Sequence, residues 1–199
     1  MNKMIIGIIG LAGLVVVGAA AWFLASPLFI DNVVDEAFPV QLPSSEELAQ
    51  MSEEELKQME TKAMEAAAAM PDKEMAEPMP EPVSANPSVF SQGQFQDADS
   101  FHQGSGLATI YQLPDGGHVL RFEDFETTNG PDLHVLLAKH PAPASRDQLH
   151  EGYIDLGSLK GNIGNQNYEI PAGTDLSEYN SIVIYCMPFH VIFSTATLQ

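Results

Sequence analysis

Short apolar segments separated by glycine- and proline-containing turns fill residues 89–199, and this pattern constrains the fold more than any other feature. The segments are rich in β-branched and aromatic residues, and most are too short for a packed helix. They comprise residues 106–113, 118–125, 132–138, 153–161, 166–171, 181–186 and 190–198. A Pro-Asp-Gly-Gly turn separates the first two, as in a hairpin. We therefore expect an all-β domain, an antiparallel β-sandwich or small barrel of about seven or eight short strands.

Residues 4–30 form an apolar run without a charged side chain. A membrane-spanning helix needs about 20 apolar residues, so the run is long enough. Lys3 precedes it and Asp31 follows it, and a basic residue marks the cytoplasmic side. We expect residues 1–30 to be an uncleaved transmembrane signal anchor of a single-pass protein of the cell membrane. A cleaved signal peptide is the alternative, and both place the remaining chain outside the cytoplasm, in the periplasm or at the cell surface.

Residues 31–88 have the composition of an acidic stalk. Ser44 precedes Glu47 at the spacing of a capping box, and the residues that follow favour a helix over about 45–70. The helix then meets a proline-rich stretch with too few large apolar side chains to form a core. We expect this stretch to be a linker to the β domain at 89–199, and we expect the helix not to pack on that domain.

Acidic side chains dominate the charge of this chain. It carries 27 acidic and 8 basic side chains in 199 residues, a formal net charge of −19. Without a basic patch to neutralise phosphates, the composition argues against nucleic-acid binding. It also argues against docking on anionic lipid headgroups. The partners that remain are the membrane, through the N-terminal segment, and a redox partner or cell-envelope protein that the sequence does not name.

Cys186 is the only cysteine of the chain. It alternates with Ile182 and Ile184 on one face of a predicted strand, while Val183 and Tyr185 lie on the other face. On such a face a cysteine is commonly a small buried hydrophobe. An unpaired thiol is nevertheless unusual in an exported protein, because oxidising compartments convert spare thiols into disulfides. A packing role and a role in redox chemistry or ligation therefore both stay open.

The run YCMPFH at residues 185–190 partly matches the cysteine–histidine loop of blue-copper proteins. A copper centre here would take Cys186, His190 and His134 as ligands, the His2Cys set of copper electron transfer. An extra residue separates Pro188 from His190, and no methionine follows as an axial ligand. Covalent c-type haem is excluded, because its Cys-x-x-Cys-His motif is absent. The cofactor is thus unknown, with haem, copper and a bare thiol all open.

Several motifs along residues 91–198 occur together in a fixed order. They are Gly93-x-Phe95, His102 followed by Gly106, NGPDLHVLLA, DLGSLKGNIGNQNYEIP and YNSIVIYCMPFHVIFSTATL. In this order they resemble the "DM thirteen" electron-transfer domain, which occurs beside DOMON and cytochrome-type domains in cell-surface proteins and alone in bacterial exported proteins. The resemblance implies a β-rich extracytoplasmic module whose single cysteine acts in redox, as a bare thiol or as ligand to a prosthetic group.

Cys186 is the residue to which the resemblance assigns this redox or ligand role. The segment around His134 also matches, whereas Tyr185 stands where the family pattern has tryptophan, and His190 lies outside the pattern. Motifs of serine hydrolases, zinc proteases and phosphate-binding loops are absent. Two functions follow: a membrane-tethered electron-transfer or thiol-redox module centred on Cys186, or a non-enzymatic β-sandwich that binds a protein or cell-envelope partner, with Cys186 structural.

Overall fold

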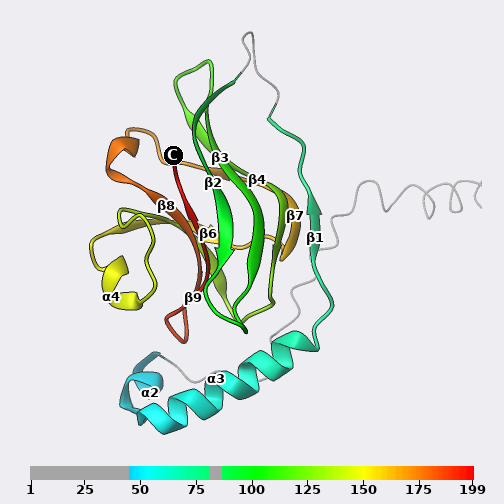
Figure 1. Ribbon diagram of the computed structural model, residues 1–199, viewed down its shortest axis with the longest axis vertical. Helices are drawn as coiled ribbons and strands as arrows, with labels where there is room; N and C mark the ends of the chain where they lie inside the picture. Colours follow the sequence, from blue (N-terminus) through cyan, green and yellow to red (C-terminus); the bar gives the residue numbers. More distant parts are fainter. Residues whose placement is uncertain (1–44, 81–86) are drawn as a thin grey trace, which may run out of the picture. The chain divides into compact units, whose positions relative to one another are not determined.

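Nine strands form one mixed β-sheet that curls around its own core (Figure 1). The computed structural model describes residues 45–80 and 87–199. The strands are β1 (Glu74–Ala76), β2 (Ser88–Asp97), β3 (Gly104–Gln112), β4 (His118–Thr127), β5 (Leu133–Ala138), β6 (Tyr153–Ser158), β7 (Ile163–Glu169), β8 (Ser181–Cys186) and β9 (Val191–Thr197). Their order across the sheet is β1-β7-β4-β3-β2-β9-β8-β5-β6.

Strand β2 joins the two halves of this sheet. Its residues 88–94 pair with β3, and its last residues, Phe95 to Asp97, pair with β9. All strand pairs from β2 to β9 are antiparallel, as predicted. The prediction of a sandwich or a small barrel needs correction, because β2 belongs to both halves and leaves one continuous half-barrel. A short 3-10 helix, Leu176–Glu178, precedes β8.

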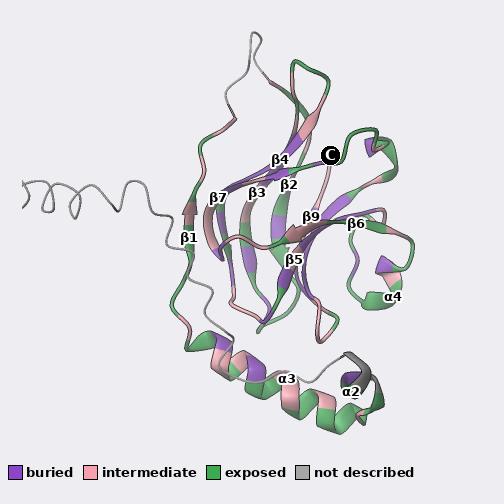
Figure 2. Cartoon of the chain, turned by 180° about the vertical axis from the view of Figure 1, so that it is seen from behind, coloured by how far each residue is buried: buried purple, intermediate pink, exposed green. Residues whose placement is uncertain are grey.

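The inner face of the curl holds the main hydrophobic core. Strands from both halves contribute to it: Phe95, Phe122 and Phe125 from one half contact one another edge-on or tilted, with ring centroids 4.8–5.0 Å apart. Val135 and Ile184 from the other half are fully buried in the same cluster. Figure 2 shows these buried positions along the strands. The alternation of apolar residues therefore places these side chains together on the inner face of the curl.

A second, smaller cluster covers the outer face of β5, β8 and β9. It contains Leu136, Val183 and Tyr185, with Leu149 from the short helix α4 (Arg146–Leu149) packed on them. Because the two clusters lie on opposite faces, strand β8 is buried on both faces, which explains its continuous apolar sequence.

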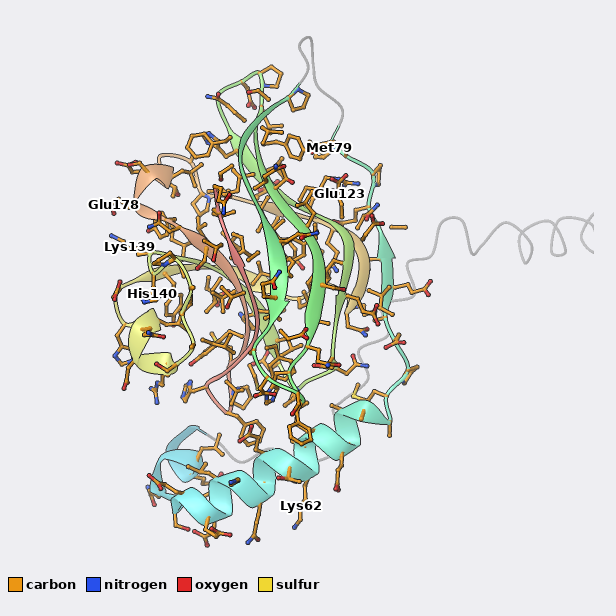
Figure 3. The ribbon with its side chains drawn as sticks, viewed as in Figure 1. Lys62, Met79, Glu123, Lys139, His140 and Glu178 are labelled. Atoms are coloured by element: carbon orange, nitrogen blue, oxygen red, sulfur yellow. The ribbon has the colours of Figure 1, made fainter. Side chains whose placement is uncertain are left out.

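Lys139, just after β5, forms an ion pair with Glu178 at the rim (Figure 3).

In the part of the chain that the structure describes, two helices precede the sheet: α2 (Ser45–Gln50) and α3 (Glu53–Ala68). The predicted single helix is interrupted at residues 51–52, where Ser52 caps α3 and forms a capping box with Glu55. The predicted cap at Ser44 lies outside the described residues. Met64 of α3 packs against the main core. This differs from the expected free stalk, because the face of α3 that carries Met64 is apolar enough to be buried on the sheet.

The stretch expected to be a proline-rich linker contains the edge strand β1. Met75 and its neighbours pair in parallel with β7. Glu77 follows the strand, accepts hydrogen bonds from Lys160 Nζ at 2.8 and 2.9 Å, and accepts another from the Asn167 amide at 2.7 Å. Backbone pairing and these charged contacts need no apolar side chains, so the low hydrophobicity of the stretch did not reveal them. The sheet is mixed because β1 pairs in parallel with β7, whereas the other described strand pairs are antiparallel.

In residues 45–80 and 87–199, the structure holds no helix that is long and apolar enough to cross a membrane. The predicted anchor at 1–30 and the start of the predicted stalk, 31–44, lie outside the described residues.

Candidate functional site

Cys186 ends strand β8 on the inner face of the sheet. It pairs with Leu133 of β5 and with Val191 of β9. The side chain belongs to the main core and is 1% exposed. Its Sγ donates a hydrogen bond to the carbonyl oxygen of Pro131 at 3.2 Å. The predicted alternation of β8 is confirmed, and it places the thiol under the turn between β8 and β9.

Burial raises the pKa of the Cys186 thiol to about 12. A hydrogen bond from the Phe189 backbone acts in the opposite direction, while the negative charges of Asp132 and Glu60 add to the increase. The thiolate is the nucleophile and the metal ligand, so a thiol with this pKa is unreactive at neutral pH in the conformation described. Chemistry at Cys186 therefore requires a change in its surroundings.

His134 lies on the opposite face of the sheet from Cys186. In the register of β5 and β8, Leu133 pairs with Cys186 and His134 pairs with Tyr185, and successive residues point to opposite faces. The ring of His134 is held by carboxylates: its Nδ1 lies 2.8 Å from Asp155 and its Nε2 lies 3.2 Å from Asp132. His134 and Cys186 therefore cannot bind the same metal ion.

His190 lies in the turn between β8 and β9 with φ of 57° and is exposed. Its ring is near Tyr185, with centroids 6.2 Å apart, whereas Phe189 packs inward against the core. The Phe189 ring therefore lies on the core side of the turn, and the His190 ring lies on its solvent side. Across the described part of the chain, no three His, Cys, Asp or Glu side chains are grouped to hold a metal ion. The three residues proposed for copper do not fit that cofactor.

His102, which the sequence analysis did not select as a site residue, is a buried histidine with one unpaired nitrogen. It lies 5% exposed in the loop between β2 and β3. Asp99 Oδ1 accepts hydrogen bonds from the backbone amides of Phe101 and His102, and its Oδ2 lies 2.8 Å from His102 Nδ1. His102 Nε2 has no hydrogen-bond partner. Two signals were available in the sequence, the His102–Gly106 motif and the Asp99–His102 spacing, and the latter is common in turns.

A groove of about 890 Å³ lies between α3 and the sheet and is lined in part by His102. The described residues that line it include six acidic side chains, Glu60, Glu65, Asp72, Asp97, Asp99 and Glu126. Lys57 is the only lysine or arginine among them. Cys186 is not one of the lining residues. A haem or other planar group placed in this groove would therefore not contact the cysteine sulfur without a rearrangement.

The structure defines an all-β module with one buried thiol. A family model described as "Electron transfer DM13" matches residues 94–198, so the chain belongs to this family. The match spans β3 to β9 with the last four residues of β2, and it confirms the resemblance noted in the sequence. No curated protein and no solved structure matches the chain.

Proposed function

We propose that this chain is an electron-transfer module outside the cytoplasmic membrane, tethered by residues 1–30, with Cys186 as its redox group. The observation that carries the proposal is the electron-transfer family match over residues 94–198, which includes Cys186. The apolar run at 4–30 and the acidic composition of the remainder support the tether and the exported location.

The chemistry of a single cysteine limits the reaction. With no second cysteine in the chain, Cys186 cannot close an internal disulfide. We propose exchange with a disulfide of a partner protein. The Cys186 thiolate attacks one sulfur, the partner's S–S bond breaks, and a mixed disulfide forms. The departing partner sulfur leaves as a thiolate and takes up a proton equivalent to the one that Cys186 lost. A further thiolate then attacks the Cys186 sulfur, the mixed disulfide breaks, and the partner's second sulfur leaves as a thiolate and takes up a proton. The partner is thereby reduced by two electrons, and Cys186 and the further thiol are left joined in a disulfide.

Access to the thiol is the step that the fold has to provide. The turn at residues 187–190 follows Cys186 directly, and Phe189 in that turn packs against the core that surrounds the sulfur. Opening of this turn would admit water and lower the pKa of the thiol, since burial is the main cause of its increase. Such local openings need less free energy than global unfolding.

The test is the reaction of the native protein with a small aromatic disulfide over a series of low urea concentrations. We expect one thiolate equivalent released per chain, at a rate that changes little with urea, because a local opening exposes little surface. A Cys186→Ser variant should release none. If the rate rises with the full urea dependence of global unfolding, the thiol is only a core residue and the proposal fails.

The second candidate is a binding module without redox chemistry. It is favoured by the 1% exposure of Cys186 together with the groove beside α3. Under this alternative a Cys186→Ser variant would keep its partner and its cellular role. The two candidates are separated by measuring partner capture and electron exchange on the same variant.

A further inference from the structure

The unpaired nitrogen of His102 has the features of a metal ligand. Asp99 Oδ2 lies 2.8 Å from Nδ1, and in the tautomer that donates from Nδ1 to this carboxylate, Nε2 carries a lone pair. A histidine that binds a metal typically donates its other ring N–H to such a carboxylate, which orients the ring and raises its basicity. Since His102 is 5% exposed, leaving Nε2 without any partner is unfavourable.

Glu60 supplies a second ligand atom at a suitable distance. Its Oε1 lies 3.8 Å from His102 Nε2, which is too long for a hydrogen bond. Zinc–nitrogen and zinc–oxygen bonds of about 2.0–2.2 Å allow one ion to bridge atoms at this separation. Nε2 is buried without a hydrogen-bond partner, and an ion that bridges the two atoms would give it a bond.

The surrounding charge also favours a cation. The groove beside this pair is lined by six acidic side chains and one lysine among the described residues. Lys62 of α3 points away from the sheet (Figure 3) and so does not neutralise them. Imidazole with carboxylate is a donor set that zinc and neighbouring transition metals accept, whereas magnesium and calcium prefer oxygen alone.

We propose that His102 Nε2 and Glu60 Oε1 bind one divalent transition-metal ion of the zinc type, with water from the groove in its remaining positions. The ion joins α3 to the loop between β2 and β3. Helix α3 is thereby held against the sheet by metal–ligand bonds as well as by the packing of Met64 on the core. Cys186 is not a ligand in this site, so the proposal does not depend on the proposed electron-transfer chemistry.

The test is zinc titration of the full chain by calorimetry at neutral pH, with thermal unfolding and Co²⁺ absorption as further readouts. We expect one Zn²⁺ per chain, a higher melting temperature with Zn²⁺ that a chelator reverses, and Co²⁺ bands typical of nitrogen and oxygen ligands. Glu60→Gln and His102→Gln should each weaken binding at least about tenfold. Asp99→Asn should weaken it by roughly 10- to 100-fold, through loss of the orienting carboxylate.

Two controls make the result specific. Glu65→Gln removes another acid of α3 that lines the groove, and His140→Gln removes a histidine that the groove does not include. Both should bind Zn²⁺ within about twofold of the wild type. The proposal is overturned if the wild type shows no binding, or if Glu60→Gln binds as tightly as Glu65→Gln. If His102→Gln does not fold, Glu60→Gln and Asp99→Asn still decide the outcome.

Discussion

A thiol that is 1% exposed with a pKa of about 12 is stable in an oxidising compartment because it is protonated and shielded. Under the proposed export, this shielding explains how the chain keeps a single cysteine without losing it to mixed disulfides. The same shielding means that any redox role of Cys186 is gated by movement of the turn at 187–190. Cys186 is then protected while the turn is closed and able to react when the turn opens.

Substitution of Cys186 should be destabilising but tolerated. Cys186→Ala removes the sulfur and leaves a small cavity, while Cys186→Ser buries a hydroxyl that can still donate to Pro131. We expect each to lower the free energy of unfolding by about 1–3 kcal/mol, measured by urea denaturation. A change below about 0.3 kcal/mol in both variants would contradict the packing described for the thiol.

The raised pKa of Cys186 also predicts a pH dependence of stability. Its pKa rises from 9.0 to about 12 on folding, so above pH 9 the unfolded chain releases this proton first and becomes favoured. The stabilisation is complete below pH 9 and is lost as the pH rises toward 12. Relative to Cys186→Ala, the wild type should lose about 1 kcal/mol between pH 9 and pH 10. Parallel curves for the two proteins would contradict a buried, protonated thiol.

At the scale of elements, β1 and α3 make residues 53–78 part of the folded unit. The carboxylate of Glu77 illustrates how. Burial alone would raise its pKa, but hydrogen bonds from Lys160 and from the Asn167 amide outweigh burial and hold the pKa below its usual value. A charged side chain just after a three-residue strand thus attaches β1 to β7 and to the loop that precedes β7.

Replacing Glu77 tests this attachment. Glu77→Gln keeps the shape but loses the charged hydrogen bonds, and we expect the free energy of unfolding to fall by about 1–2 kcal/mol. Glu74→Gln is the matched control, because Glu74 is exposed in the same strand, and it should change stability by less than about 0.5 kcal/mol. Equal effects of the two substitutions in thermal or urea unfolding would show that β1 is not held by Glu77.

The elements that the sequence predicted are those whose residues alternate or end at strong turns. β3, β4, β5, β8 and β9 were placed to within a few residues, and so was the inner face that carries Cys186. β1 was missed because its stabilisation comes from backbone pairing and from Lys160, which lies far along the chain. The isolation of His134 from Cys186 depends on strand register, and the pairing of His102 with Glu60 depends on tertiary contact. Neither the strand register nor this tertiary contact can be predicted from a local sequence pattern.

At the scale of the whole molecule, the proposed tether makes a topological prediction. Protease added to intact cells should remove the β domain and leave a membrane-bound fragment that contains residues 1–30, because the charge change from Lys3 to Asp31 places the chain outside. Immunoblotting with antibodies against both ends would follow the two parts. Protection of the β domain until the membrane is lysed would contradict the exported location.

The central claim, that Cys186 exchanges electrons with an outside partner, is tested most directly by trapping its redox state in intact cells. Cells are quenched in acid, and free thiols are then labelled in denaturant with a reagent that adds mass, so that reduced and oxidised chains separate on a gel. We predict that part of the chain carries Cys186 in a reducible mixed disulfide, and that this fraction changes when the medium is made more oxidising or more reducing. A Cys186 that is fully reduced under every condition would contradict the account.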